Sequence, residues 1–287
     1  MTVSNETFVF ECHGETLLAV ANIPEICERT GVLVVVGGPQ YRIGSHRQFL
    51  LLARNLVSAA YPVMRFDYRG MGDSTGELRN FEQIGDDIEA AINAFMARYP
   101  QIERVVLWGL CDAASASLMY RYQRDDDRLA GFCLLNPWVR SEATLAKTQI
   151  KHYYGQRLLE AAFWKKLLSG QLGIVGALKG FLESLIASRK QSETSTQGQI
   201  PGFQEQMGLA LAATQHPILL LLSGDDYTAK EFGEYALNSK TMSSALARSN
   251  VTTCHIMGAN HTFASAEWRG KVELETIAWL GKVKASA

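Results

Sequence analysis

Short apolar runs alternate with amphipathic segments along the first half of the chain. Four such runs lie at residues 31–36, 63–66, 105–108 and 131–135. Continuous apolar stretches of this length are typical of strands that are buried on both faces of a sheet. The segments at 48–60 and 81–99 instead keep their apolar residues on one helical face. This alternation predicts a parallel sheet with helices on both sides.

Strand patterns also lie outside this region. Residues 7–12 and 15–21 form two alternating runs around His13-Gly14, which predicts an antiparallel hairpin before the parallel strands. Nearer the end of the sequence, strands are predicted at 217–222 and 251–257, and helices at 230–246 and 266–283. The chain is therefore predicted to be of the α/β class, with a mostly parallel central sheet of about eight strands.

The strand pattern is interrupted between residues 139 and 215, where only helical patterns are found. We predict three parts: a first core segment at 1–138, a helical lid at 139–215 and a second core segment at 216–287. An insertion at this point would cover the carboxyl ends of the strands, and its aromatic residues would line an acyl pocket. A simpler alternative is that these aromatic residues only attach the lid to the core.

A sharp turn with a cysteine follows the predicted strand at 105–108. Gly109, Cys111 and Ala113 form a G-x-C-x-A pattern between this strand and a predicted helix. The nucleophile elbow has the same order of strand, turn and helix, with the pattern G-x-S-x-G. A thiol at a helix N-terminus meets N–H groups and a dipole that favour the thiolate. The alternative is that Cys111 is a small buried apolar residue, as many free cysteines are.

Two later strands also end in loops with chemically active side chains. Asp225 and Asp226 follow the strand at 217–222, and His261 follows the strand at 251–257. Nucleophile, acid and histidine in this chain order, each at the carboxyl end of a strand, is the order of the α/β-hydrolase fold. We predict that Cys111, Asp226 and His261 are catalytic, and the sequence leaves Asp225 open as the acid. Each residue has a role, because the histidine takes the thiol proton and the acid orients the imidazole.

The glycine-rich loop after residue 36 is the predicted partner of the elbow. In hydrolases this loop supplies one of the two N–H groups that bind the oxyanion. Because Pro39 has no N–H, we predict Gln40 as that donor and the backbone of Asp112 as the other. An ordinary glycine turn is the alternative. The candidate substrate-binding residues are Gly38, Tyr41, Arg42, His46 and Trp138.

The side chain of Asp112 is unusual beside a nucleophile. A carboxylate at this point would either raise the pKa of the thiol or bind a cationic group of the substrate. The sequence does not decide between these two roles.

Composition and charge exclude several classes of partner. The 287 residues have a formal net charge of −1, which argues against nucleic acid as the main partner. No apolar run is long enough to span a membrane, and the first residues lack the pattern of a signal peptide. The five cysteines are scattered and form no C-x-x-C pair, so we expect neither a disulfide framework nor a metal site. We predict a cytoplasmic protein without a cofactor.

Four motifs carry a resemblance to a known family. They are Gly37-Gly-Pro-Gln-Tyr-Arg-Ile-Gly-Ser-His-Arg, Phe66-Asp-Tyr-Arg-Gly-Met-Gly-Asp-Ser, Trp108-Gly-Leu-Cys-Asp-Ala-Ala-Ser and Leu135-Asn-Pro-Trp-Val-Arg-Ser. With them the chain resembles, over nearly its whole length, the exosortase A system-associated hydrolases, type 1. The resemblance implies an α/β-hydrolase fold and a genomic link to bacterial exopolysaccharide and protein-sorting systems, but no defined substrate. The elbow cysteine is also similar to that of dienelactone hydrolase.

These observations predict a cysteine-dependent hydrolase or acyltransferase that acts on a small-molecule ester, thioester or lactone. A plain amide is disfavoured, because a thiolate leaves the tetrahedral intermediate more readily than an amine does. A non-catalytic binding protein with a hydrolase fold is the alternative, suggested by Asp112 and by Pro39. A nucleotide-binding protein is disfavoured, because the glycine-rich loop at 67–76 matches neither phosphate-binding fingerprint.

Overall fold

The computed structural model describes residues 3–38, 40–140 and 201–285. Residues up to Val139 and from Gly202 onward form one compact unit. Most of the segment for which the sequence predicts a helical lid, 139–215, lies outside the described residues. The lid therefore stays a prediction.

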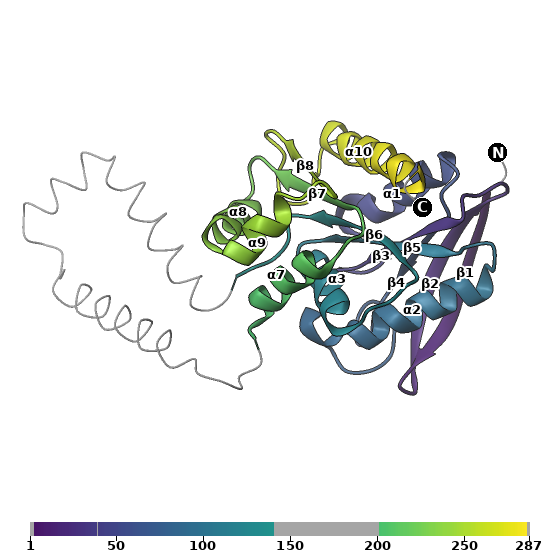
Figure 1. Cartoon of the computed structure of the whole chain (residues 1–287). Helices are drawn as coiled ribbons and strands as arrows, with labels where there is room; N and C mark the ends of the chain where they lie inside the picture. Colours follow the sequence, from purple (N-terminus) through teal and green to yellow (C-terminus); the bar gives the residue numbers. More distant parts are fainter. Residues whose placement is uncertain (1–2, 39, 141–200, 286–287) are drawn as a thin grey trace, which may run out of the picture. The chain divides into compact units, whose positions relative to one another are not determined.

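The unit is built on one sheet with the strand order β1-β2-β4-β3-β5-β6-β7-β8 (Figure 1). Its strands are β1 (Val3–Cys12), β2 (Glu15–Pro24), β3 (Thr30–Val35), β4 (Val63–Phe66), β5 (Arg104–Leu110), β6 (Leu129–Leu135), β7 (Ile218–Ser223) and β8 (Val251–Ile256). The pairings of β1 with β2 and of β2 with β4 are antiparallel, and all other pairings are parallel. The prediction of a hairpin followed by a mostly parallel sheet of eight strands is confirmed.

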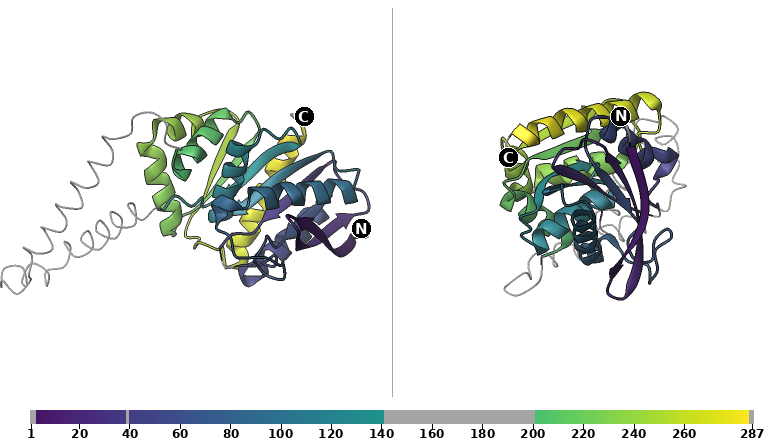
Figure 2. Two further views of the ribbon diagram at one scale, coloured as in Figure 1. Left: turned by 90° about the horizontal axis from the view of Figure 1, so that it is seen from below. Right: turned by 90° about the vertical axis from the view of Figure 1, so that its right-hand side faces the viewer.

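Helices cover both faces of this sheet (Figures 1 and 2). One face carries α1 (Gln48–Ser58) and α10 (Ala266–Ala285), and the other carries α2 (Gly85–Arg98), α3 (Asp112–Gln123), α7 (Phe203–Ala213), α8 (Tyr227–Asn238) and α9 (Lys240–Leu246). Each face has its own apolar cluster, because side chains along a strand point alternately to the two sides. Val32 and Val34 belong to one cluster, and Leu33 and Val35 to the other.

Two helical predictions differ from the structure. The pattern at 230–246 predicts one helix, but the chain forms α8 and α9 with a break at Ser239. The Ser239 hydroxyl accepts the N–H of Met242, which starts the second helix. The last part of the segment predicted as a helical lid forms α7, which belongs to the described unit, where it packs against α3 and α9.

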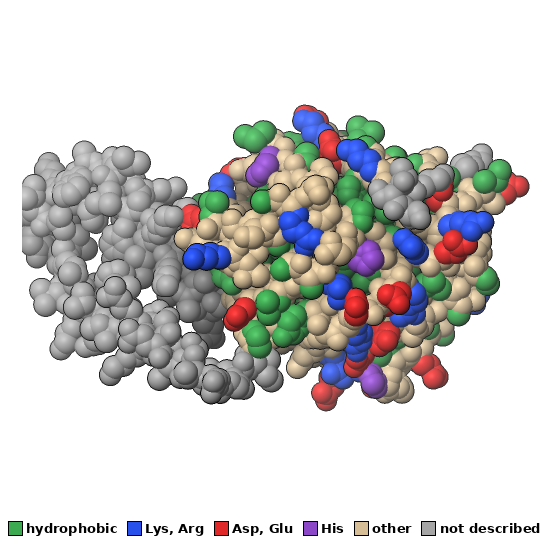
Figure 3. Space-filling model, viewed as in Figure 1, with side chains coloured by type: hydrophobic (Ala, Val, Ile, Leu, Met, Phe, Trp, Pro, Cys, Tyr) green, Lys and Arg blue, Asp and Glu red, His purple; other side chains and the backbone are tan. Residues whose placement is uncertain are grey.

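The surface of the described residues carries charges of both signs. On the face shown in Figure 3, basic and acidic side chains lie intermixed, in keeping with the formal net charge of −1. Within the described ranges, no helix combines the length and the apolar character needed to cross a bilayer.

Candidate active site

Cys111 joins β5 to α3 in a strained backbone conformation. Its φ and ψ angles are 63° and −125°, a region that residues other than glycine rarely adopt. Its neighbours hold this conformation: the N–H of Cys111 donates to the carbonyl of Leu135 at 2.8 Å, and its carbonyl accepts the N–H of Trp138 at 3.3 Å. The turn at Cys111 is therefore hydrogen-bonded to the end of β6 and to the residues that follow it.

Small residues allow this turn to close. A Cβ atom added to Gly109 would lie 2.6 Å from the carbonyl carbon of Ala113 and 2.8 Å from the nitrogen of Ala114. These atoms belong to the backbone of α3, so a side chain at 109 would push the helix away from the strand. This contact explains the glycine at the first position of the G-x-C-x-A pattern.

The five cysteines are all free thiols in different surroundings. Cys133 on β6 is fully enclosed, and burial raises its pKa well above the ordinary value. Cys111 is half-buried and starts the 12-residue helix α3. Its surroundings are those of a helix N-terminus rather than those of a sealed core.

His261 pairs with one of the two candidate acids. Its Nδ1 lies 2.9 Å from Oδ2 of Asp226, which is only 9 % exposed. The side chain of Asp225 is 81 % exposed and faces Lys230 at 3.6 Å. Of the two acids, Asp226 is therefore the one that contacts the imidazole.

Asp226 also begins the helix α8. Its carboxylate accepts the N–H groups of Thr228 at 3.3 Å and Ala229 at 3.0 Å, which is the contact pattern of a helix cap. Burial by itself raises the pKa of Asp226, but the hydrogen bond and charge of His261, together with these N–H groups, bring it below the ordinary value. The side chain is thus held as a carboxylate with one oxygen toward the imidazole.

Asn136, which the sequence analysis did not single out, links the histidine loop to the elbow. Its side-chain nitrogen donates to the carbonyl of His261 at 3.1 Å and to the Ser223 hydroxyl at 2.7 Å. Two residues later, Trp138 donates its N–H to Cys111. The segment after β6 therefore contacts the loops of both Cys111 and His261. The local signal was a polar residue directly after a buried strand, followed by proline.

Asp112, the first residue of α3, directs its carboxylate toward the loop after β3. Oδ2 accepts the N–H of Gly38 at 2.8 Å. A Cβ atom added to Gly37 would lie 2.1 Å from Oδ1, so the loop comes this close only because residue 37 is glycine. Oδ1 is buried and has no hydrogen-bond partner among the described residues. The carboxylate therefore takes up an N–H group of the loop that the sequence analysis predicts to supply an oxyanion donor.

The environment of Asp112 favours its neutral form. Burial raises the pKa of this carboxyl group above its ordinary value, although the N–H of Gly38 and the nearby His261 act in the opposite direction. A carboxyl group with a raised pKa takes up a proton on folding between its unfolded and folded pKa values. Stability therefore falls as the pH rises through that interval.

An Asp112→Asn variant is expected to be more stable than the wild type at pH 8, by about 2–4 °C in Tm. The amide is neutral and still offers an oxygen to Gly38, so it avoids the cost of a buried charge. The difference should shrink as the pH falls toward about 4, where the wild-type carboxyl group is also protonated. Thermal melts between these pH values measure it, with the exposed Asp127→Asn as the control. A gain that does not change with pH contradicts this prediction.

Gln40, the predicted oxyanion donor, is held through its side chain. Its amide oxygen accepts the N–H of Ser45 at 3.1 Å and Nε2 of Gln48 at 3.4 Å. These contacts tie the loop to the start of α1. The loop N–H that meets the elbow belongs to Gly38, two residues earlier, which the sequence predicts as a substrate-binding residue.

The other predicted substrate-binding residues of this loop have different partners. Arg42 forms ion pairs with Asp67 and Asp73, and its N–H donates to Asp67 at 2.7 Å. Tyr41 is exposed and lies beside the Arg42 guanidinium, 5.7 Å from the ring centroid. His46 is also exposed. Trp138, in contrast, lies beside the elbow and is half-buried.

Comparison with known proteins assigns the chain to a family. The family described as serine aminopeptidase, S33, matches residues 28–265, which is most of the chain. The chain belongs to the serine aminopeptidase S33 family. This family assignment makes the chain a member of a hydrolase family.

Solved structures show that this S33 family member has the α/β-hydrolase fold. An esterase from Pyrococcus furiosus superposes with a TM-score of 0.66 at 13 % identity, over 97 % of this chain and 91 % of that one. Est1E from Butyrivibrio proteoclasticus, with ferulic acid bound, superposes with a TM-score of 0.60 at 11 % identity, over 96 % of this chain and 99 % of that one. An alpha-beta serine hydrolase homologue from Coxiella burnetii superposes with a TM-score of 0.58 at 16 % identity, over 96 % of this chain and 99 % of that one. Among curated proteins, none matches the chain.

Proposed function

We propose that the chain is a cysteine-dependent acyl hydrolase or acyltransferase whose acyl donor is an ester, a thioester or a lactone. The observation that carries this proposal is the hydrogen-bonded pair of His261 and Asp226, whose loop is linked through residues 136–138 to the strained turn of Cys111. A nucleophile, a base and an orienting acid are the parts that covalent acyl transfer requires.

In the proposed reaction, the sulfur of Cys111 attacks the acyl carbonyl and gives its proton to His261. The imidazolium passes this proton to the leaving alcohol or thiol, and a thioester with the enzyme remains. Water or an acceptor hydroxyl then attacks the thioester and transfers a proton through His261 to the departing sulfur. Asp226 keeps the imidazole oriented and stabilises its positive charge. The N–H of Asp112 and the N–H of Gly38 or Gln40 bind the oxyanion.

The nucleophile argues for an activated acyl donor. The family description names an aminopeptidase, and the chain of this protein carries cysteine at the elbow. A thiolate is a much better leaving group than an amine anion, so the tetrahedral intermediate of an amide returns to substrate more often than it goes forward. With a thiol or an activated alcohol as the leaving group, the forward departure competes better. We therefore favour esters, thioesters and lactones over peptides.

The biological setting that we propose follows from the sequence resemblance. The four motifs similar to exosortase A system-associated hydrolases suggest a role linked to exopolysaccharide production, in which a sugar hydroxyl is a reasonable acyl acceptor besides water. We also propose a cytoplasmic location, where the five free thiols stay reduced.

Intact-protein mass spectrometry with p-nitrophenyl acyl esters tests this proposal. The expected result is release of p-nitrophenol together with a mass increase of one acyl group, located on the peptide that contains Cys111. If folded protein with a titratable Cys111 thiol shows neither the release nor the adduct, the enzymatic proposal fails.

A small-molecule binding protein with a hydrolase fold is the second candidate. The observation that favours it is the Asp112 carboxylate, which takes up the N–H of Gly38 where an oxyanion would bind. In that case the esters would bind without forming an adduct, and equilibrium titration would detect saturable binding. An adduct on Cys111 excludes this candidate.

A further inference from the structure

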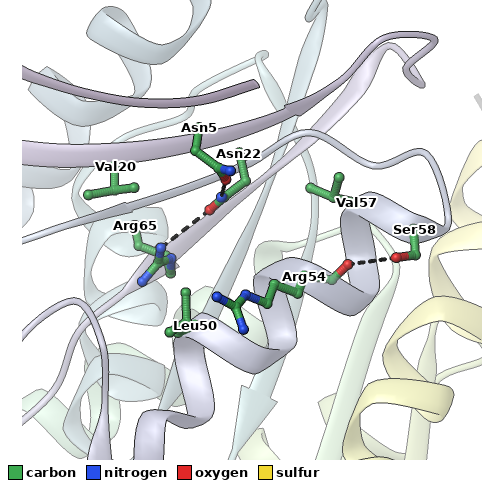
Figure 4. Close-up of a pocket in the computed structure, with 8 residues that line it drawn as sticks. All are labelled: Asn5, Val20, Asn22, Leu50, Arg54, Val57, Ser58 and Arg65. Carbon is green, nitrogen blue, oxygen red and sulfur yellow. Dashed lines mark hydrogen bonds between the residues drawn. The ribbon is translucent and has the colours of Figure 1, made fainter. Parts of the chain in front are cut away.

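A cavity that Cys111 does not line lies between α1 and the antiparallel side of the sheet (Figure 4). We call it the α1 cavity; it has a volume of about 360 Å³ and is lined by Asn5, Val20, Asn22 and Arg65 from β1, β2 and β4, and by α1. The register explains this lining. Asn5 pairs with Asn22, and Val20 pairs with Arg65, so all four side chains point to the same face of the sheet.

Arg65 lacks an acidic partner in this cavity. It is only 3 % exposed, yet among the described residues it donates to neutral oxygens: the Arg42 carbonyl at 2.9 Å and the Asn22 side chain at 3.3 Å. Its Nε is buried without a hydrogen-bond partner among the described residues. The nearby carboxylate of Asp67 is already paired with Arg42. A buried guanidinium without a counter-charge is costly, so a negative charge in the cavity would stabilise the protein.

Arg54 adds a second positive charge to the α1 cavity. Its side chain extends from α1 beside Leu50 (Figure 4). None of the ion pairs found among the described residues includes Arg54. None of the residues that line the cavity is an acid. Burial, followed by repulsion from Arg42 and Arg54, lowers the pKa of Arg65 to about 10. The Arg65 guanidinium is therefore charged at neutral pH.

The other lining residues indicate what the anion carries. Val20, Leu50 and Val57 give the α1 cavity an apolar wall, and Asn5 and Asn22 add amide groups. A volume of about 360 Å³ is in the range of small-molecule sites and exceeds the need of a single inorganic ion. The chemistry that fits is an oxyanion attached to a short apolar body.

We propose that the α1 cavity binds a small organic anion, with a carboxylate or phosphate group between Arg54 and Arg65 and an apolar chain against α1. The exposed guanidinium of Arg54 hydrogen-bonds the oxyanion directly, and the negative charge compensates Arg65. This site is separate from the cysteine chemistry and does not depend on it.

Calorimetric titration of the full-length protein at constant ionic strength tests the proposal. Hexanoate and hexyl phosphate are the anionic probes, and hexanamide is the neutral probe of the same chain length. We expect saturable binding of at least one anion and no binding of hexanamide. A second titration at a higher salt concentration should show weaker binding of the anion. The comparison of the two anions shows which headgroup the cavity prefers.

Three variants locate the binding. Arg54→Gln should raise the dissociation constant of the anion at least about tenfold. Because Arg54 is exposed, this variant is expected to fold. Arg65→Met should abolish saturable binding. Arg47→Gln changes an exposed arginine just before α1 that does not line the cavity, and its affinity should equal that of the wild type. Absence of saturable anion binding, an unchanged affinity in Arg54→Gln, or equal binding of hexanamide each overturns the proposal.

Discussion

A Cys111→Ala variant is expected to lose at least about 10³-fold in kcat/KM on p-nitrophenyl esters, because no acyl-enzyme forms without the nucleophile. The fold should persist, since alanine keeps the backbone hydrogen bonds of residue 111 to Leu135 and Trp138. Ester turnover with purified protein measures the loss, and near-ultraviolet circular dichroism checks the fold.

Two further variants sharpen this result. Cys27→Ala removes a cysteine on the loop after β2 and should leave the rate unchanged. Cys111→Ser offers a hydroxyl in place of the thiol, so its residual rate should exceed that of Cys111→Ala and depend fully on His261 as the base. An alanine variant that retains turnover within tenfold of the wild type would mean that the thiol takes no part in the reaction.

The fold follows closely from local patterns in the sequence. All eight strands were predicted, the first two from the alternation in the hairpin and most of the others from short apolar runs. The exception is β8, where Thr252, Thr253 and His255 interrupt the apolar residues. The break between α8 and α9 was missed, because it depends on contacts of Ser239 that the sequence pattern does not record. Its N–H donates to the carbonyl of Tyr235 at the end of α8, and its hydroxyl accepts the N–H of Met242 at the start of α9. Periodicity records the buried face of a helix and not its caps.

The candidate site was predictable only where a residue belongs to a local pattern. The elbow and the two loops after β7 and β8 carry such patterns. The contacts of Asp112 with Gly38 and of Asn136 with His261 join residues that are 74 and 125 positions apart, so no local pattern records them. Arg65 gave a faint signal, since it is a charged residue within an otherwise apolar run.

The side chain of Asp112 occupies a backbone donor that the proposed reaction would need. Its carboxylate already accepts the N–H of Gly38, so an oxyanion that uses this donor must displace it. The stability of Asp112→Asn at different pH values reports the charge of this group without requiring turnover. The same variant, assayed with esters, separates the two roles left open by the sequence: an effect on the thiol changes all substrates alike, whereas a cation-binding role changes only substrates with a positive charge.

Asp226→Asn is expected to lower kcat on the order of 10³–10⁴-fold while leaving most of the stability intact. Asparagine caps a helix about as well as aspartate, and its oxygen, in the place of Oδ1, can still accept the N–H of Thr228. Its amide nitrogen then faces Nδ1 of His261 and favours the wrong imidazole tautomer. Steady-state kinetics and urea unfolding of the same preparations measure the two effects.

The contrast with Asp226→Ala separates catalysis from structure. Alanine removes the cap as well as the pair, so we expect a similar loss of kcat together with a loss of about 1 kcal/mol of stability.

Because the folded-state pKa of Asp226 is lowered, the stabilisation from its charge is present above the unfolded pKa near about 4 and is lost as the pH falls through the folded pKa. The stability difference between the wild type and Asp226→Asn should therefore vanish in acid. Asp225→Asn, at an exposed neighbour, is the matched control; if it reduced kcat as much as Asp226→Asn does, the acid of the proposed triad would have to be reassigned.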